Sequence, residues 1–116
     1  MRSGPGRPAV LLDGAHNPAG ARVLAAALAD RRRPPSRTWL FACMADKERA
    51  PLIELLLPHV DRVVCARGTT SDRFMDPEGL AQEVRDAGGQ ATAAGTVGDA
   101  LLELLRRGGS RDEILV

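Results

Sequence analysis

The chain has 116 residues, 44% hydrophobic and 27% charged, which is ordinary for one globular domain with its own hydrophobic core. A net charge of +1 and an aromatic content of 3% exclude the basic surface and the aromatic stacking residues that are typical of nucleic-acid binding. The same net charge excludes a basic surface for binding an anionic membrane. No apolar run approaches the roughly 18 residues of a membrane span. Cys43 and Cys65 lie in apolar runs without metal-type spacing, so we expect free thiols in a reducing cytoplasm.

Short apolar runs predict strands, and the longer amphipathic stretches between them predict helices. The expected strands are Ala9–Leu12, Thr38–Met44, Arg62–Ala66, Gln90–Ala94 and Ile114–Val116. Three of these runs are almost continuously hydrophobic, which favours strands that are buried on both faces of a parallel sheet.

The first two helices have recognisable starts. Asn17 is expected to cap the first helix, with Pro18 as its first residue and Pro34-Pro35 beyond its end. Its expected apolar face comprises Val23, Leu24, Ala27 and Leu28. Asp46 is the expected cap of the second helix, although Pro51 favours a regular start only near Ala50.

The last two helices have signals at both ends. Asp76-Pro77 is expected to start the third helix and Gly88-Gly89 to end it. Thr96 and Asp99 have the spacing of a capping box for the fourth, which Gly108-Gly109 closes.

Strands alternating with helices predict a Rossmann-like α/β fold: a mostly parallel, doubly wound sheet of about five strands with four helices. Residues 1–116 form a single domain in this interpretation. The chain begins almost at its first strand and stops on the apolar run "EILV", so we expect a piece of a longer protein.

In such a sheet ligands bind beyond the carboxyl ends of the strands, where the expected loops are 13–17, 45–47 and 67–76. In the first loop, Asp13 and His16 flank helix N–H groups that attract anions. Turn and helix-start chemistry explains the same loop without any ligand, so the residues alone leave both readings open. No P-loop, G-x-G-x-x-G or G-x-S-x-G motif is present.

A family resemblance adds to this pattern. "LLDGAHNPAGARVLAAAL" resembles the D-G/A-A-H-N-P signature of folylpolyglutamate synthases and dihydrofolate synthases, in the Mur ligase superfamily. The similarity continues through "TWLFACMADKERAPLIELLLPHVDRVVCA", "DRFMDPEGLA" and the closing "EILV", in order over nearly the whole chain.

The resemblance implies the carboxy-terminal domain of an ATP-dependent carboxylate–amine ligase of folate biosynthesis and one-carbon metabolism. Such a ligase phosphorylates a folate or dihydropteroate carboxylate, and the amine of L-glutamate then displaces the phosphate. By the same resemblance Asp13 contacts ATP, and His16 is catalytic or places glutamate. The further substrate-binding candidates are Asn17, Lys47, Ser71 and Arg73, and no residue is assigned to a metal.

The implied cofactors are ATP and magnesium, with the magnesium held mainly by a central domain that this sequence lacks. The implied partner is therefore the missing N-terminal ATPase and folate-binding part, and this chain alone is expected to be inactive. A stand-alone α/β interaction module with the same fold, and without catalysis, is the alternative hypothesis.

Overall fold

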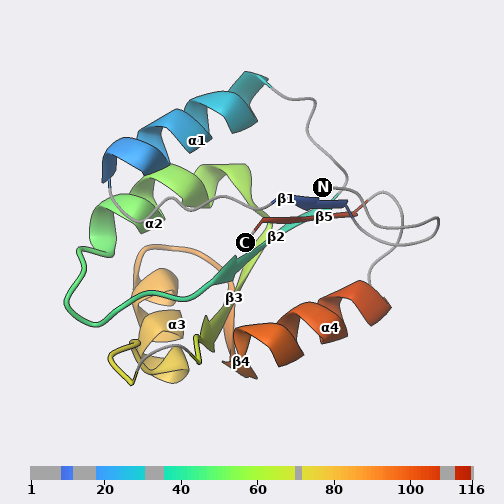
Figure 1. Cartoon of the computed structure of the whole chain (residues 1–116). Coiled ribbons are helices and arrows are strands. Elements are labelled where there is room, and N and C mark those ends of the chain that lie inside the picture. The colour runs from blue at the N-terminus through green and yellow to red at the C-terminus, as the bar shows by residue number, and fades with distance from the viewer. Residues whose placement is uncertain (1–8, 12–17, 31–35, 70–71, 108–111, 116) are drawn as a thin grey trace.

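The computed structural model describes residues 9–11, 18–30, 36–69, 72–107 and 112–115 (Figure 1). The strands in this part of the chain are β1 (Ala9–Leu11), β2 (Ser36–Phe41), β3 (Arg62–Arg67), β4 (Ala91–Thr96) and β5 (Asp112–Leu115). The helices are α1 (Pro18–Asp30), α2 (Ala50–Leu56), α3 (Pro77–Asp86) and α4 (Val97–Arg107), and a short 3-10 turn, Leu57–His59, continues α2. None of the helices described is long and apolar enough to cross a membrane.

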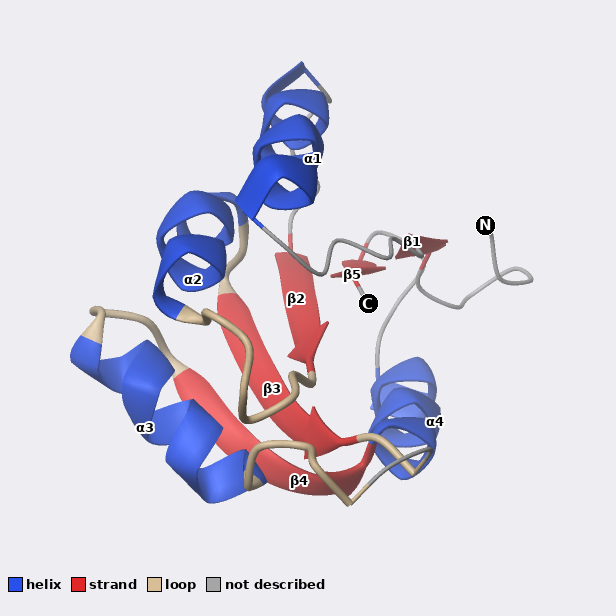
Figure 2. Cartoon of the chain, turned by 60° about the vertical axis from the view of Figure 1, so that its left-hand side comes forward, coloured by secondary structure: helices blue, strands red, loops and turns tan. Residues whose placement is uncertain are grey.

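The described strands form one sheet in the order β1-β5-β2-β3-β4, and each neighbouring pair is parallel. Helices α1, α2 and α3 cover one face, and α4 covers the other (Figures 1 and 2). The chain steps outward from β2 to β4 along one face and returns through α4 along the opposite face. The predicted α/β class, with a parallel sheet and helices on both faces, is confirmed.

Strand β2 is the centre of the core because nearly all of its residues are buried. Trp39 and Phe41 face α1, α2 and α3, and their rings stack with centroids 4.1 Å apart. Alternation along the strand turns Leu40 to the other face, where it packs with Ala100 and Leu104 of α4. The main cluster also contains Leu24, Leu28, Leu52, Ile53, Leu56, Val60, Val63, Cys65, Leu80, Ala81 and Val84.

The start of β2 contains a buried charge that the sequence analysis did not single out. Arg37 is only 1% exposed, and its Nη1 donates to the carbonyl oxygen of His59 at 3.0 Å. Its backbone N–H donates to Asp61 Oδ2 at 2.7 Å, and the N–H of Asp61 donates back to the Arg37 carbonyl at 2.8 Å. These bonds tie the amino end of β2 to the turn that precedes β3.

The predicted apolar face of the first helix is half right. Leu24 and Leu28 are buried, but Val23 is 72% exposed and Ala27 is exposed too. The buried face instead runs through Ala21. Because α1 is rich in alanine, the spacing of its hydrophobic residues defines no single face, and packing against the sheet decides which one is buried.

Two predicted boundaries in the second βα unit are wrong. β2 ends at Phe41, and Met44 instead forms an isolated antiparallel bridge with Phe74. α2 begins at Ala50, as Pro51 indicated, but Asp46 is not its cap. The residue at the N-cap position is Arg49, which makes no side-chain capping bond.

The other helix-end predictions within the described residues are confirmed. The Asp76 side chain accepts from the N–H of Gly79 at 3.2 Å, and Thr96 Oγ1 accepts from the N–H of Asp99 at 3.3 Å. Gly88 follows α3 with a φ of +95°, a conformation that glycine adopts without a side-chain clash. β4 runs to Thr96, beyond the predicted Ala94, and passes directly into α4.

Candidate functional site

The carboxyl ends of the parallel strands meet at one edge of the sheet, where the structure describes residues 42–49 after β2 and residues 68–69 and 72–76 after β3. Lys47 and Arg73 lie on these loops. The candidates Asp13, His16 and Asn17 and the candidate Ser71 lie outside the described residues. Their assignment to the site remains a prediction.

The two described loops are joined through their backbones. The N–H of Ala45 donates to the carbonyl oxygen of Arg73, and the N–H of Met75 donates to that of Cys43, both at 2.8 Å. These bonds flank the antiparallel bridge between Met44 and Phe74. The loops therefore form one connected surface rather than two independent segments.

A close contact with Gly68 keeps the second loop near the sheet. A Cβ atom on Gly68 would lie 2.4 Å from Cζ of Phe74, which is far inside van der Waals contact. The ring of Phe74 therefore rests directly on the glycine backbone. Glycine at the exit of β3 lets Phe74 turn inward while its neighbour Arg73 remains exposed.

The structure brings the loops of Lys47 and Arg73 together. Lys47 is exposed, and its N–H donates to the carbonyl oxygen of Met44 at 3.2 Å, which closes the turn. The guanidinium of Arg73 is paired with the carboxylate of Asp46, and both side chains are more than half exposed. Asp46, the expected helix cap, thus serves as a partner for the predicted substrate-binding arginine.

A third cation lies on the same edge. Arg67 ends β3, and its Nη2 lies 3.2 Å from Oδ1 of Asp76, the cap of α3. Both members of this pair are exposed, so it is weak and open to competition by another anion. Lys47, Arg67 and Arg73 are thus exposed cations at this edge, and Asp76 and Asp46 pair with the two arginines.

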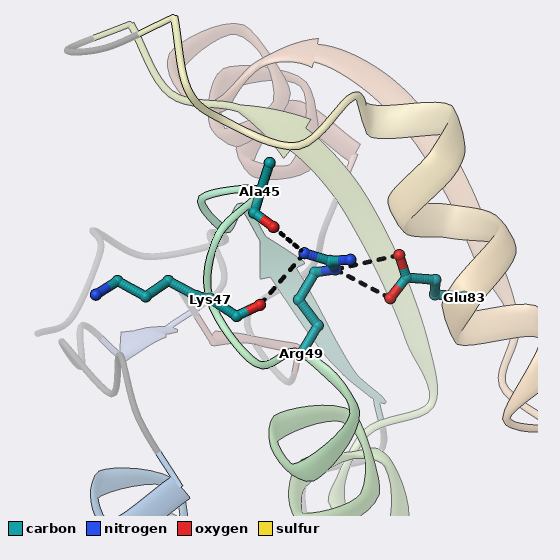
Figure 3. Close-up of polar contacts among 4 residues, drawn as sticks. All are labelled: Ala45, Lys47, Arg49 and Glu83. Atoms are coloured by element: carbon teal, nitrogen blue, oxygen red, sulfur yellow. Dashed lines mark hydrogen bonds and ion pairs between the residues drawn. The ribbon is translucent and has the colours of Figure 1, made fainter.

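Arg49, which the sequence analysis did not single out, holds the turn that carries Lys47 (Figure 3). Its Nε lies 3.0 Å and 3.1 Å from the two carboxylate oxygens of Glu83 on α3. Its Nη1 donates to the carbonyl oxygens of Ala45 at 2.8 Å and Lys47 at 3.3 Å. The hydrogen bond to Glu83 raises the pKa of Arg49, which stays charged.

The side chain of Lys47 points away from Arg49 and Glu83 (Figure 3). We call the hydrogen bonds of Arg49 to Glu83, Ala45 and Lys47 the Arg49 bracket. The carbonyl group of Lys47 takes part in this bracket, while its ammonium group is directed elsewhere. Local sequence signals did not reveal this arrangement, because Arg49 and Glu83 are 34 residues apart. The segment "ADKER" by itself reads as a charged first turn of a helix.

A groove of about 690 Å³ lies between α2 and α3. Its lining includes Ile53, Leu57 and Pro58 together with the carboxylates of Glu54 and Asp86, but neither Lys47 nor Arg73, the two predicted site residues that the structure describes. Among the residues that the structure describes, no cluster of three His, Cys, Asp or Glu side chains could hold a metal ion.

Comparisons with known proteins identify what this architecture is similar to. The sequence model of the family described as "Mur ligase, glutamate ligase domain" matches residues 1–116. No curated protein sequence matches the chain.

Solved structures of folate-related ligases share the fold. Mycobacterium tuberculosis folylpolyglutamate synthase, complexed with ADP and AMPPCP, matches 97% of the chain with 27% identity and a TM-score of 0.75. The bifunctional folylpolyglutamate synthase/dihydrofolate synthase of Yersinia pestis, complexed with AMPPNP and a manganese ion, matches 98% with 27% identity and a TM-score of 0.78. Escherichia coli FolC, in complex with DHPP and ADP, matches all of it with 22% identity and a TM-score of 0.83.

The chain spans less than a third of the length of these solved proteins: 29% of the mycobacterial chain, 28% of the Yersinia chain and 27% of the Escherichia chain.

Proposed function

Because the chain belongs to the Mur ligase, glutamate ligase domain family, we propose that it is the C-terminal domain of an ATP-dependent ligase that adds L-glutamate to dihydropteroate or folate. Its role is to close one side of the reaction cleft, contacting ATP and placing the incoming glutamate. The observation that carries this proposal is at the carboxyl edge of the sheet, where the exposed cations Lys47 and Arg73 lie on two loops that are hydrogen-bonded to each other.

The chemistry of the proposed reaction explains why cations belong at this edge. ATP supplies the phosphoryl group that activates the folate carboxylate, and the glutamate amine then attacks the resulting acyl phosphate. Both substrates are anionic, so negative charge accumulates where they meet. Cations at this edge, such as Lys47 and Arg73, would stabilise that charge.

Roles within the proposed cleft follow the residue chemistry. Asp13 is proposed to contact ATP, and Asn17 and Ser71 to contribute polar groups towards substrate. His16 is proposed either to accept the proton of the glutamate ammonium or to hold its carboxylate, since an imidazole group can do both. Lys47 and Arg73 are proposed to bind carboxylate or phosphate oxygens.

The remaining machinery is assigned to a partner. An N-terminal ATPase and folate-binding part would supply the P-loop and hold most of the magnesium, and closure against it would complete the site. The chain alone is therefore proposed to be inactive. Its free, buried thiols Cys43 and Cys65 fit the cytoplasmic location proposed for such an enzyme.

A titration followed by amide NMR tests this function. The chain is titrated with MgATP and with L-glutamate, first alone and then with the ATPase part of a folylpolyglutamate synthase supplied in trans. Shifts concentrated at residues 13–17, at Lys47 and at Arg73 are expected, and they should be larger when the second protein is present. Shifts elsewhere, or none with the ATPase part added, would favour a non-catalytic interaction module of the same fold.

Two variants sharpen this experiment. Lys47→Ala should weaken the glutamate-dependent shifts, because it removes a cation from the carboxyl edge. Arg107→Ala is the matched control, since Arg107 is an exposed cation on α4 that is paired with Glu103 one helical turn away. Equal losses in both variants would show that general charge, not this site, attracts the ligand.

A further inference from the structure

Lys47 is the only lysine of the chain, and it lies in a turn, outside every helix and strand. An exposed turn is ordinarily the most mobile part of a domain. A mobile ammonium group loses conformational entropy each time it binds an anion, so a fixed turn makes it a better ligand. The contacts that hold this turn therefore bear directly on what Lys47 does.

The bracket around the turn depends on the shape of the arginine side chain. The Nε of the Arg49 guanidinium is shared between both carboxylate oxygens of Glu83, and Nη1 is shared between the carbonyl oxygens of Ala45 and Lys47. A planar fork with several donors serves two acceptor groups at once, whereas a lysine ammonium lacks this fixed geometry. The side chain of Arg49 is only 18% exposed, so these bonds are partly shielded from water.

Glu83 is a fixed point for the bracket because α3 is firmly packed. Leu80, Ala81 and Val84, which surround Glu83 in the helix, are each 0% exposed. Through Glu83, Arg49 thus connects the turn of Lys47 to α3, a helix whose inner face is fully buried. The connection runs through main-chain carbonyl groups and leaves the Lys47 side chain directed away (Figure 3).

We propose that Arg49 is a positioning residue. By binding Glu83 of α3 and the carbonyl oxygens of the turn, it keeps the turn of Lys47 in place against α3, so that the Lys47 ammonium group is positioned to bind an anion. Only the assignment of Lys47 to substrate rests on the proposed function. The rigidity of the turn is inferred from the contacts of Arg49 and does not depend on the proposed function.

The unique lysine makes the proposal measurable. Reductive methylation with ¹³C-formaldehyde keeps the charge of Lys47 and gives one lysine signal, distinct from that of the N-terminus. Relaxation of this signal, together with ¹⁵N relaxation of the amides of residues 45–48, reports the order of the turn. The variants are Arg49→Ala and Arg49→Lys, and Arg85→Ala is the control that removes another cation of this region, one that pairs with Glu78 and donates to the carbonyl oxygen of Ala91 at 3.1 Å.

In the unmodified sequence the backbone amides of the turn should show order parameters of about 0.85, the value of rigid backbone. In Arg49→Ala they should fall below about 0.6, the range of flexible segments, and the Lys47 methyl signal should sharpen. Arg49→Lys should lie close to Arg49→Ala, because a point charge can replace the ion pair but not the fork. Arg85→Ala should leave both readouts unchanged.

Exchanging the two charges distinguishes the effect of the guanidinium hydrogen bonds to the turn from the effect of the ion pair with Glu83. This test remains informative if Arg49→Ala does not fold. The double variant Arg49→Glu with Glu83→Arg keeps opposite charges between the turn and α3 but places no donor beside the carbonyl groups of Ala45 and Lys47. A mobile turn in this folded variant is expected. A turn as ordered as in the unmodified sequence, in this variant or in Arg49→Ala, would overturn the proposal.

The proposed function can fail separately. If MgATP and L-glutamate, with the ATPase part present, leave the Lys47 methyl signal of the unmodified sequence unchanged, Lys47 is not part of the substrate site. The relaxation data on the Arg49 variants would still decide whether Arg49 positions the turn.

Discussion

At the scale of single residues, the carboxyl edge depends on ion pairs of unequal strength. Arg49 is partly buried and contacts both oxygens of Glu83, so its bracket is shielded and geometrically specific. The pair between Arg73 and Asp46 is exposed on both sides, so it contributes little to stability and opens readily. This contrast suits the proposed roles: Arg49 holds a loop in place, and Arg73 exchanges Asp46 for an anionic ligand.

Cys65 is the residue for which a pH effect follows from burial. It is 0% exposed on β3, and burial raises the pKa of its thiol to about 12. In the unfolded chain a thiol ionises at about pH 8.5, so as the pH rises the thiol loses its proton in the unfolded state before it does so in the folded state. The stabilisation by the neutral thiol is therefore complete below that pH and is lost as the pH rises towards about 12.

Urea unfolding at about pH 7 and about pH 10 tests this effect in the unmodified sequence and in Cys65→Ala. The free energy of unfolding should fall with pH in both proteins, by up to roughly 1.4 kcal/mol per pH unit for each buried thiol that titrates only on unfolding. The fall should be smaller in Cys65→Ala, where Cys43, whose pKa burial also raises, still contributes. The same pH dependence in both proteins would contradict the role assigned to Cys65.

At the scale of elements, helix starts that look alike in the sequence are built differently. Asp76 accepts the N–H of Gly79 and caps α3, with Pro77 as the first helical residue. Asp46 also precedes a helix containing a proline near its start, yet it caps nothing and pairs with Arg73. The turn between Asp46 and α2 is closed by Arg49 instead.

Alanine substitutions distinguish these two aspartates. Asp76→Ala should lower the free energy of unfolding by about 1 kcal/mol, the usual effect of losing a helix cap. Asp46→Ala should change it by less than about 0.5 kcal/mol, because the ion pair that it removes is exposed on both sides. Urea denaturation of both variants under the same conditions gives the comparison. A full capping loss at Asp46 would show that α2 begins earlier than Ala50.

At the scale of the whole molecule, the sheet separates two hydrophobic clusters of different size. Three helices pack over the larger one, whereas α4 is the only helix described on the opposite face. Leu104 of α4 packs there with Leu40, Ala66 and Ile114, and so joins three neighbouring strands. Much of the cover of that face therefore depends on one helix.

A pair of leucines on α4 tests this dependence. Leu104→Ala should lower the free energy of unfolding by about 2–5 kcal/mol, because Leu104 is only 9% exposed and its loss leaves a cavity. Leu102→Ala is the control, since Leu102 is 55% exposed and its loss should matter by less than about 0.5 kcal/mol. Thermal and urea unfolding of the two variants provide the measurement. Equal effects would mean that α4 packs on a different face.

The sequence by itself determined the order of strands and helices, the α/β class, the caps at Asp76 and Thr96 and the end of α3 at Gly88. Such signals act within a few residues, since a cap, a proline or a glycine restricts only its own neighbourhood. The D-G-A-H-N-P segment pointed to the family to which the chain belongs. The roles of Asp13 and His16 stay predictions, as do those of Asn17 and Ser71.

Only the tertiary structure decided which face of α1 is buried, where β2 ends and what Asp46 does. It also revealed the bracket of Arg49 and Glu83, a contact between residues 34 positions apart. No local pattern encodes such a contact, because its existence depends on how the segment before α2 and the helix α3 are placed over the sheet. Packing of the chain, rather than any short motif, therefore brings together the two loops that carry Lys47 and Arg73.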